Sequence, residues 1–257
     1  MKDILEYSKQ APNDYPFVYQ DTMERMFSED LNGALGDYEE RLLENVSKLR
    51  EDYNILRKEP RYRRPLNYER FFDIPSGDIR SLLLGTYSYA FKSGGQQAYK
   101  DFNQDKEFLL DLENIVEISR LANQHQGKIS KSYQNLVLSK LRVAFNNDYS
   151  SGQFLDDLKG YKDFKKAADS SYTPSMPNKK NIVDNYSTRE VSRHVNDGRM
   201  AGYGKTQRVL KYIYKTRADE RVSSKCAPWH NRVLDPAQAK AKIPQHRNCR
   251  CTIVPYI

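Results

Sequence analysis

Apolar residues recur every three or four positions through residues 21–56, and this long stripe constrains the fold more than any other feature of the chain. The stripe consists of Met23, Phe27, Leu31, Leu35, Tyr38, Leu42, Val46, Leu49, Tyr53 and Leu56. This spacing places the side chains on one face of an α-helix about 50 Å long. Such a helix buries its stripe in a helical bundle or, as the alternative, in a coiled coil with a partner. We expect Pro60 to end it, and Gly33 and Gly36 to bend or interrupt it.

More helical patterns follow, and no strand pattern occurs before residue 169. They cover residues 76–94, 108–122, 129–145 and 154–168. Ser76 is a good N-cap for the first of these, and Gly94–Gly95 is its expected stop. Residues 21–168 are therefore predicted to form an α-helical body. Residues 1–20 combine Pro12 and Pro16 with aromatic residues, which favours an extended arm.

The remainder of the chain has a different character. Residues 169–185 are rich in Ser, Pro, Asn and Lys, which is typical of a linker. In residues 186–257, Ser187-x2-Glu190 matches a capping box and predicts a helix from Ser187 to about Met200. The β-branched and aromatic run 209–214 predicts a strand, with 252–255 as its partner. The predicted fold class is α+β, mostly α, with a helical N-terminal body and a small C-terminal α+β module.

The charge of the chain is concentrated at its C-terminal end. The formal net charge is +8, and residues 179–257 carry seventeen Lys and Arg against six Asp and Glu. A basic third of this kind favours a polyanionic partner, nucleic acid being the obvious one, although basic surfaces also serve only for solubility. The proline-punctuated stretch 57–70 alternates basic residues with tyrosines, which suits phosphate contact and stacking or an acidic protein partner. The candidate contact residues are Arg57, Lys58, Arg61, Arg63, Arg64, Arg70, Lys179 and Lys180.

Hydropathy argues against a membrane partner. The chain has neither a run of eighteen apolar residues nor a basic-then-apolar leader. We therefore expect synthesis in the cytoplasm.

All three cysteines and two of the four histidines lie in the last 32 residues. They are arranged as Cys226-x3-His230 and His246-x2-Cys249-x-Cys251, which offers five candidate ligands for the four positions of a structural zinc. The spacing is not that of a standard zinc finger. Two alternatives stay open: the cysteines are small buried hydrophobes, or Cys226 forms a disulfide with Cys249 or Cys251 and leaves one thiol unpaired.

The same residues bear on catalysis. Cys226, Asp219 and either His230 or His246 could be assembled into a thiol triad. The chain shows no sequence context of a thiol protease, and the His-x-Glu of zinc deaminases is absent. We therefore expect no catalytic residues and a structural role for the cluster.

Two segments carry a resemblance to a known family. The run T-R-A-D-E-R-V, residues 216–222, and the ending P-x-H-x-N-C-R-C, residues 244–251, closely resemble the C-terminal motif of the phage Mu F-like head morphogenesis proteins. The upstream S-T-R-E-V-S-R-H-V-N-D-G-R, residues 187–199, is similar to the Thr-Arg-Glu helix of that family. The chain departs from the family at Ser223, where many members have the first cysteine of a Cys-x2-Cys pair.

The matching motif residues are Arg189, Asn196, Asp219, Arg221 and Arg250. We expect Arg189 and Asp219 to form a buried ion pair. Because successive residues of a strand alternate faces, Arg250 should point away from a face that Cys249 and Cys251 share. His194 lies on the same helix, where it could face the cysteines or be an ordinary core residue.

The resemblance implies a minor head protein of a tailed phage, inside the capsid near the portal vertex. The phage portal protein is then the expected partner, with major capsid or scaffolding protein and double-stranded DNA as further candidates. The alternative is a phage-borne or toxin-like hydrolase that uses the C-terminal Cys and His residues.

Overall fold

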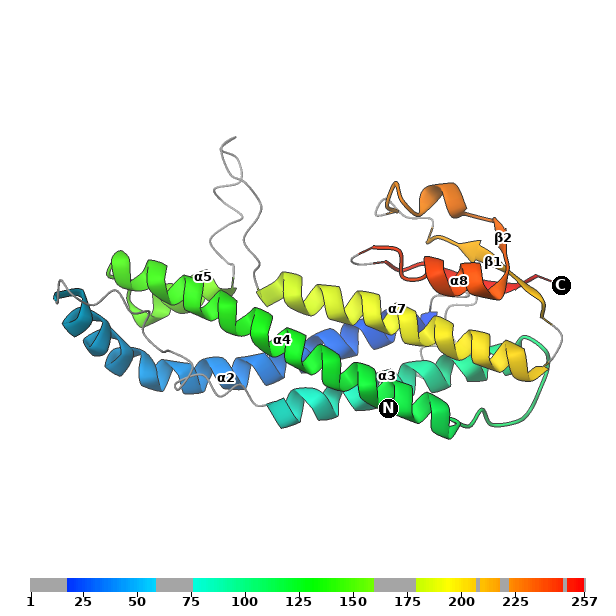
Figure 1. Cartoon of the computed structure of the whole chain (residues 1–257), viewed down its shortest axis with the longest axis horizontal. Coiled ribbons are helices and arrows are strands. Elements are labelled where there is room, and N and C mark those ends of the chain that lie inside the picture. Colours follow the sequence, from blue (N-terminus) through cyan, green and yellow to red (C-terminus); the bar gives the residue numbers. More distant parts are fainter. Residues whose placement is uncertain are drawn as a thin grey trace. The chain divides into compact units, whose positions relative to one another are not determined.

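The computed structural model describes residues 18–58, 76–159, 179–206, 209–217, 222–246 and 249–256. The helices in this part of the chain are α2 (Val18–Lys58), α3 (Ser76–Lys100), α4 (Leu112–Asn146), α5 (Ser151–Lys159), α7 (Lys179–Thr206) and α8 (Pro236–Lys242), with a 3-10 turn, η3 (Ala227–Trp229) (Figure 1). The strands are β1 (Lys211–Lys215), β2 (Val233–Leu234) and β3 (Thr252–Tyr256). The predicted class, mostly α with a small C-terminal β element, is confirmed.

The chain divides into two compact units. One comprises the described residues of Met1–Asp30, Ser81–Asn123 and Asp184–Ile257, and the other those of Leu31–Arg80 and Gln124–Val183. The predicted C-terminal module is thus part of a larger unit that also contains segments of α2, α3 and α4. The predicted boundary at residue 186 does not separate an independent domain.

The second unit has an all-helical core. Leu31, Leu35 and Leu42 of α2 are buried, as predicted from the stripe, and Tyr38 packs edge-on against Tyr133 of α4. The Tyr133 hydroxyl donates to Glu39, whose carboxylate also lies 3.1 Å from the Lys179 ammonium. A Cβ placed on Gly33 or Gly36 would touch nothing, and α2 runs through both without interruption. The expected interruption there is wrong, because the stripe continues on both sides of the glycines.

Two other predicted helix boundaries are wrong. Residues 112–146 form one helix, α4, where two were predicted, because the buried positions Ile118, Leu121, His125 and Ile129 keep helical spacing across the gap. Helix α3 continues past Gly94–Gly95 to Lys100.

The predicted linker is also wrong where the structure describes it. Residues 179–185 belong to α7, which begins eight residues before Ser187 and ends at Thr206. Ile182 and Val183 are buried, and the Ser187 hydroxyl donates to the Asp184 carbonyl inside the helix. The expected arm is shortened too, since α2 begins at Val18. Residues 1–17 and 160–178 lie outside the described part of the chain.

Glycines let α3 and α7 pack at close range. A Cβ on Gly198 would lie less than 3.0 Å from the Phe91 carbonyl oxygen, and one on Gly94 would do the same at Val195. This explains why Gly94 sits inside a helix rather than at its end.

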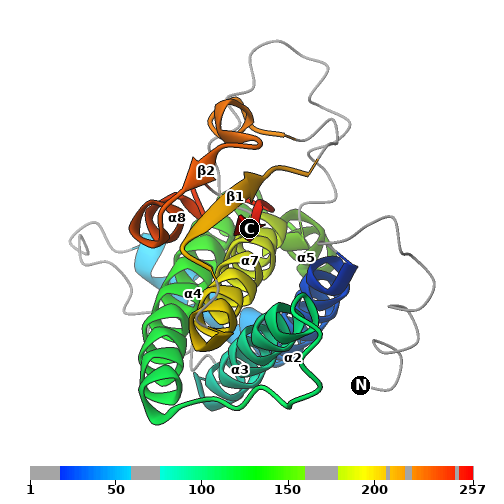
Figure 2. The ribbon, with the colours of Figure 1, turned by 90° about the vertical axis from the view of Figure 1, so that its right-hand side faces the viewer.

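The C-terminal strands form an antiparallel sheet in the order β2-β1-β3 (Figure 2). In its register Tyr214 of β1 is opposite Ile253 of β3, which confirms the predicted pairing. The sheet, η3 and α8 enclose a small core with Tyr203 of α7, and the core contains all three cysteines. Helix α8 begins with a capping box between Asp235 and Gln238. Among the described residues, no helix is long and apolar enough to cross a membrane.

Candidate metal centre

Three cysteines meet in the small core. Cys226 precedes η3, where its amide donates to the Ser223 carbonyl at 2.9 Å, and Cys249 and Cys251 immediately precede β3. Their sulfur atoms all lie within 4.8 Å of one another, and those of Cys226 and Cys249 are 3.9 Å apart. All three are free thiols and buried, with at most 5% of each residue exposed. Thiols gathered in this way can bind a metal ion.

The two histidines differ in position. The Nε2 atom of His246 lies 2.9 Å from the Cys226 sulfur. The Nδ1 atom of His230 accepts a hydrogen bond from the Thr216 amide at 3.1 Å and lies 2.7 Å from the Thr216 hydroxyl. His246 therefore contacts the cysteine group through Cys226, whereas the described contacts of His230 are with Thr216.

Tyr214, on the central strand β1, lies beside the cysteine group. Its side chain is fully buried, and its hydroxyl lies beside the sulfurs of Cys226 and Cys251 with no other partner among the described residues. Burial, and then these sulfurs, raise the pKa of Tyr214 well above its ordinary value. Tyr214 was not predicted as a site residue; its place in the aromatic strand run 209–214 was the available signal.

The thiols influence one another's ionisation. Hydrogen bonding from Cys226 and Cys251 lowers the pKa of Cys249. Contact with Cys249 raises the pKa of Cys226, and contact with Cys226 raises that of Cys251.

Helix α7 fixes the segment that carries Cys249 and Cys251. Asn196 donates to the carbonyl of Cys251 at 3.1 Å, and its side-chain oxygen accepts from the Ile253 amide and the Thr252 hydroxyl, both at 2.9 Å. Ser192 donates to the same Cys251 carbonyl at 3.1 Å, and Arg199 donates to Thr252 and to the Ile253 carbonyl. Asn196 was identified from the motif, but Ser192 and Arg199 were not.

The other motif residues are placed as follows. Arg189 lies 3.7 Å from the Glu190 carboxylate; its predicted partner Asp219 lies outside the described residues, as does Arg221, so that ion pair stays a prediction. Arg250 is half-buried while Cys249 and Cys251 are buried, which agrees with the predicted alternation, although these residues precede the strand rather than belong to it.

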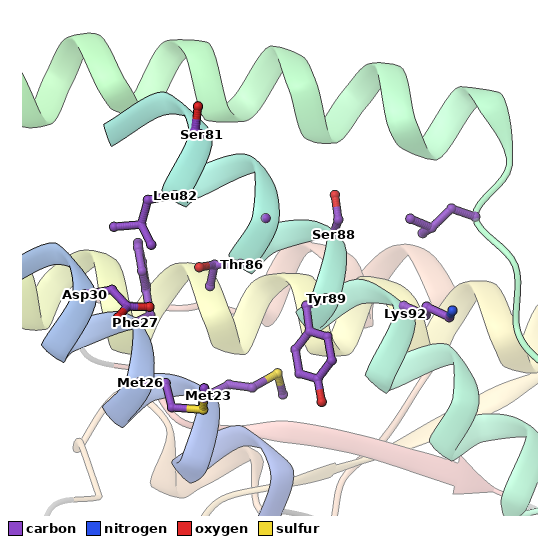
Figure 3. Close-up of a pocket in the computed structure, with 12 residues that line it drawn as sticks. Met23, Met26, Phe27, Asp30, Ser81, Leu82, Thr86, Ser88, Tyr89 and Lys92 are labelled. Atoms are coloured by element: carbon purple, nitrogen blue, oxygen red, sulfur yellow. The ribbon is translucent and has the colours of Figure 1, made fainter. Parts of the chain in front are cut away.

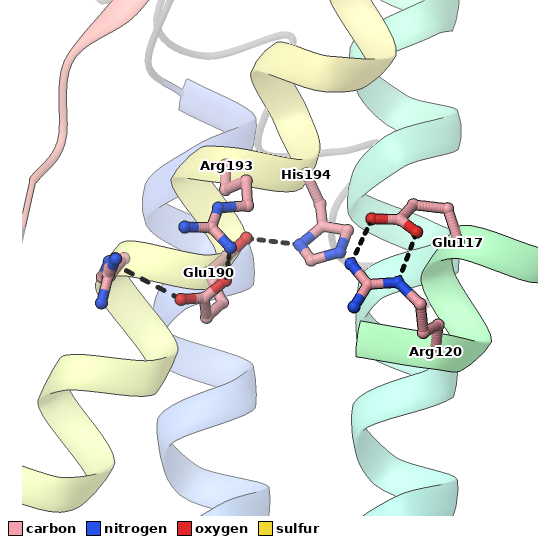
Figure 4. A network of polar contacts seen from close by, with 6 residues as sticks. Glu117, Arg120, Glu190, Arg193 and His194 are labelled. Carbon is pink, nitrogen blue, oxygen red and sulfur yellow. Dashed lines mark hydrogen bonds and ion pairs between the residues drawn. The ribbon is translucent and has the colours of Figure 1, made fainter. Parts of the chain in front are cut away.

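His194 is a core residue. Its ring stacks on Tyr87 of α3 at 4.0 Å between centroids, and its Nδ1 contacts the Glu190 carbonyl oxygen at 2.7 Å. Figure 4 shows this contact beside the Glu190–Arg193 ion pair of α7 and the Glu117–Arg120 pair of α4. The ring thus packs on helix α3 rather than on the cysteines.

The predicted nucleic-acid contacts are mostly untested. The side chains of Arg57 and Lys58 and the whole of Arg61, Arg63, Arg64 and Arg70 lie outside the described part of the structure. Lys180 is exposed, as a contact residue should be. The prediction that Lys179 is a contact residue is wrong, because its side chain is buried and its ammonium forms an ion pair with Glu39.

A second feature is an apolar pocket of about 490 Å³ between the N-terminal part of α2 and α3 (Figure 3). Met23, Met26 and Phe27 form one wall and Leu82 and Tyr89 the other. Its exposed lining is mostly hydrocarbon, with Asp30 and Lys92 among the residues at its edges.

Comparison with known proteins adds no assignment. No protein-family model matches the chain, and no curated protein or solved structure is significantly similar to it.

Proposed function

We propose that this chain is a non-enzymatic minor head protein of a tailed phage, associated with the portal vertex inside the capsid. The proposal rests on the motif resemblance. One observation supports it most directly: Asn196, in the upstream half of the resemblance, hydrogen-bonds to Cys251 and Ile253 at the end of the downstream half. The upstream helix and the end of the downstream motif are therefore joined by hydrogen bonds.

We further propose that the cysteines serve this unit by holding a structural zinc ion. Buried, closely spaced thiols are typical ligands for Zn²⁺. In a small module with a two-residue edge strand, such a clamp would supply stability that the core alone provides poorly.

Contact with packaged DNA is a further part of the proposal. The described residues from 209 onward carry eight basic side chains and a single acid, Asp235, which caps α8. Lys211, Lys225, Arg232 and Lys240 are exposed. Cations of this density bind phosphates independently of base sequence, so binding should weaken steeply with salt. Replacing the four by Ala should weaken retention of a DNA duplex on a gel at low salt, whereas the buried Lys179→Ala should not.

A thiol hydrolase is the second candidate, because the Cys226–His246 distance of 2.9 Å suits a nucleophile and its base. Two features oppose it. Cys226 is 1% exposed, so a substrate cannot reach its sulfur without opening of the module. Its pKa is also raised, whereas nucleophilic cysteines have lowered values. Rapid alkylation of Cys226 by iodoacetamide in the folded, reduced chain would favour the hydrolase.

The decisive experiment determines whether the chain is located in phage heads. Mass spectrometry of purified phage heads should detect the chain in few copies, and immobilised portal protein should retain it. Absence from heads, or equal retention by an unrelated immobilised protein, would overturn the proposed role.

A further inference from the structure

We propose that the site is a closed Cys3His zinc centre whose ligands are the sulfurs of Cys226, Cys249 and Cys251 and the Nε2 atom of His246. This assignment rests on the structural zinc proposed above, but not on a role in phage heads. It selects one histidine of the two that the sequence offers and adds Tyr214 as a hydrogen-bond donor to the sulfurs.

The sulfur positions fit a tetrahedral ion. Zn–S bonds of about 2.3 Å place two thiolates of one tetrahedron about 3.8 Å apart. The Cys226 and Cys249 sulfurs are 3.9 Å apart, and the Cys251 sulfur lies within 4.8 Å of both. An ion at the centre therefore needs sub-ångström to ångström shifts of the side chains.

His246 supplies the fourth ligand. Its Nε2 already contacts Cys226, and it precedes Cys249 by three residues in the sequence. In a tetrahedron with Zn–N of about 2.0 Å, nitrogen and sulfur lie about 3.5 Å apart. The ring must therefore withdraw from its 2.9 Å contact with Cys226, and, because the mutually close ligand atoms among the described residues are the three sulfurs alone, it must also approach Cys249 and Cys251.

His230 does not compete for this position. Its Nδ1 accepts the Thr216 amide proton, and this bond ties the ring to the residue that follows β1. The residue is exposed, whereas the three cysteines are buried.

Tyr214 is a second, independent indication of a ligand. Its hydroxyl is buried beside two sulfurs and has no other partner among the described residues, which is costly for a polar group. Metal-bound thiolates are strong acceptors, and outer hydrogen bonds of this kind typically raise metal affinity 10- to 100-fold. Tyr214 would therefore donate to a zinc-bound sulfur, and three thiolates with one dication leave a single charge for it to stabilise.

The test uses the full chain, purified anaerobically, loaded with Zn²⁺ and dialysed against metal-free buffer. Elemental analysis should find about one zinc per chain, and competition with a chromophoric chelator gives the affinity. His246→Ala should lower the affinity at least tenfold, and Tyr214→Phe about tenfold. The matched control His230→Ala should leave it unchanged.

Each result that differs from these expectations would overturn a different part of the proposal. A wild-type chain that retains no zinc, or that shows a disulfide in place of free thiols, would overturn the site. Equal losses in His230→Ala and His246→Ala, with native circular dichroism in both, would overturn the ligand assignment alone. Because cysteine variants could fail to fold, the absorption spectrum of the Co²⁺-substituted chain gives a second readout: a tetrahedral thiolate spectrum is expected and an octahedral one contradicts the site. Neither result depends on whether the chain is found in phage heads.

Discussion

Asn196 uses both ends of its amide inside the protein. Its nitrogen donates to the carbonyls of Ser192 and Cys251, and its oxygen accepts from Thr252 and Ile253. A side chain with this pattern cannot be replaced by an apolar one without leaving buried backbone groups unpaired.

Replacing Asn196 by Ala should therefore destabilise the protein by about 3 kcal/mol, because the buried Ile253 amide and Cys251 carbonyl each lose a hydrogen-bond partner. Urea unfolding followed by circular dichroism measures this. The control is Asn147→Ala at the exposed residue that follows α4, which should change stability by less than about 0.5 kcal/mol. Similar losses in both variants would contradict the role given to Asn196.

Lys179 is a second residue where burial decides the role. Lys179→Ala would leave the Glu39 carboxylate buried without its cation, and we expect a loss of about 3 kcal/mol in unfolding free energy. The neighbouring Lys180 is exposed, so Lys180→Ala should be nearly neutral. A neutral Lys179→Ala would show that the ion pair does not form.

Residue identity alone could not reveal these differences. The sequence correctly indicated that the cysteines meet, because cysteines and histidines concentrated in one stretch of chain are typical of a shared site. The sequence could not choose between His230 and His246, because that choice depends on the hydrogen bond that the Thr216 amide donates to His230. Nor could it predict that Lys179 is buried and Lys180 exposed. Adjacent residues of a helix point in different directions, and only the packing of the helix decides which of them is buried.

The carboxyl of Asp197 in α7 should make the stability of the protein depend on pH. Burial raises its pKa to about 6, although Lys240 of α8 and Arg193 oppose the shift, while Glu190 and Glu117 add to it. A raised carboxyl pKa means that the folded protein favours the protonated form. Stability is therefore lost as pH rises from about 4 to about 6, by up to about 3 kcal/mol.

Asp197→Asn removes this loss. The stability of the variant relative to the wild type should increase between pH 4 and pH 7, as measured by urea unfolding at each pH. A difference that is constant over this range would show that the Asp197 carboxyl is not destabilised by burial.

At the scale of elements, the packing of α3 on α7 depends on glycines as well as on buried side chains such as Tyr87. Gly198→Ala should destabilise the protein by more than about 2 kcal/mol, because the added methyl would collide with the Phe91 carbonyl, a backbone atom that cannot move alone. The control lies on the same helix: a Cβ on Gly204 meets nothing, so Gly204→Ala should stabilise by about 0.5–1 kcal/mol. Stabilisation by both would contradict the close approach.

This packing also explains which elements the sequence could predict. Helices with a regular stripe, such as α2, and the paired strands β1 and β3 follow from periodicity alone. Gly94–Gly95 resembles a helix stop because the same residue type serves a turn and a close contact, and only the partner helix distinguishes them. In the same way, Ser187-x2-Glu190 satisfies a capping pattern, but Ile182 and Val183 gain more by burial in a longer helix.

At the scale of the whole molecule, the C-terminal strands and α8 are built onto α7 and share a unit with parts of α2, α3 and α4. The thiols, His246 and Tyr214 lie in the core that joins these strands to α7. Closing that core with a metal ion would secure the motif-bearing end of the chain against unfolding, which is the property expected of a structural component rather than of a catalyst.

X-ray absorption at the zinc edge of the loaded full chain tests this most directly. The account predicts a four-coordinate ion with three sulfur neighbours at about 2.3 Å and one nitrogen at about 2.0 Å, and no open position. Zinc bound through fewer sulfurs with a water ligand, or no zinc bound at all, would contradict it.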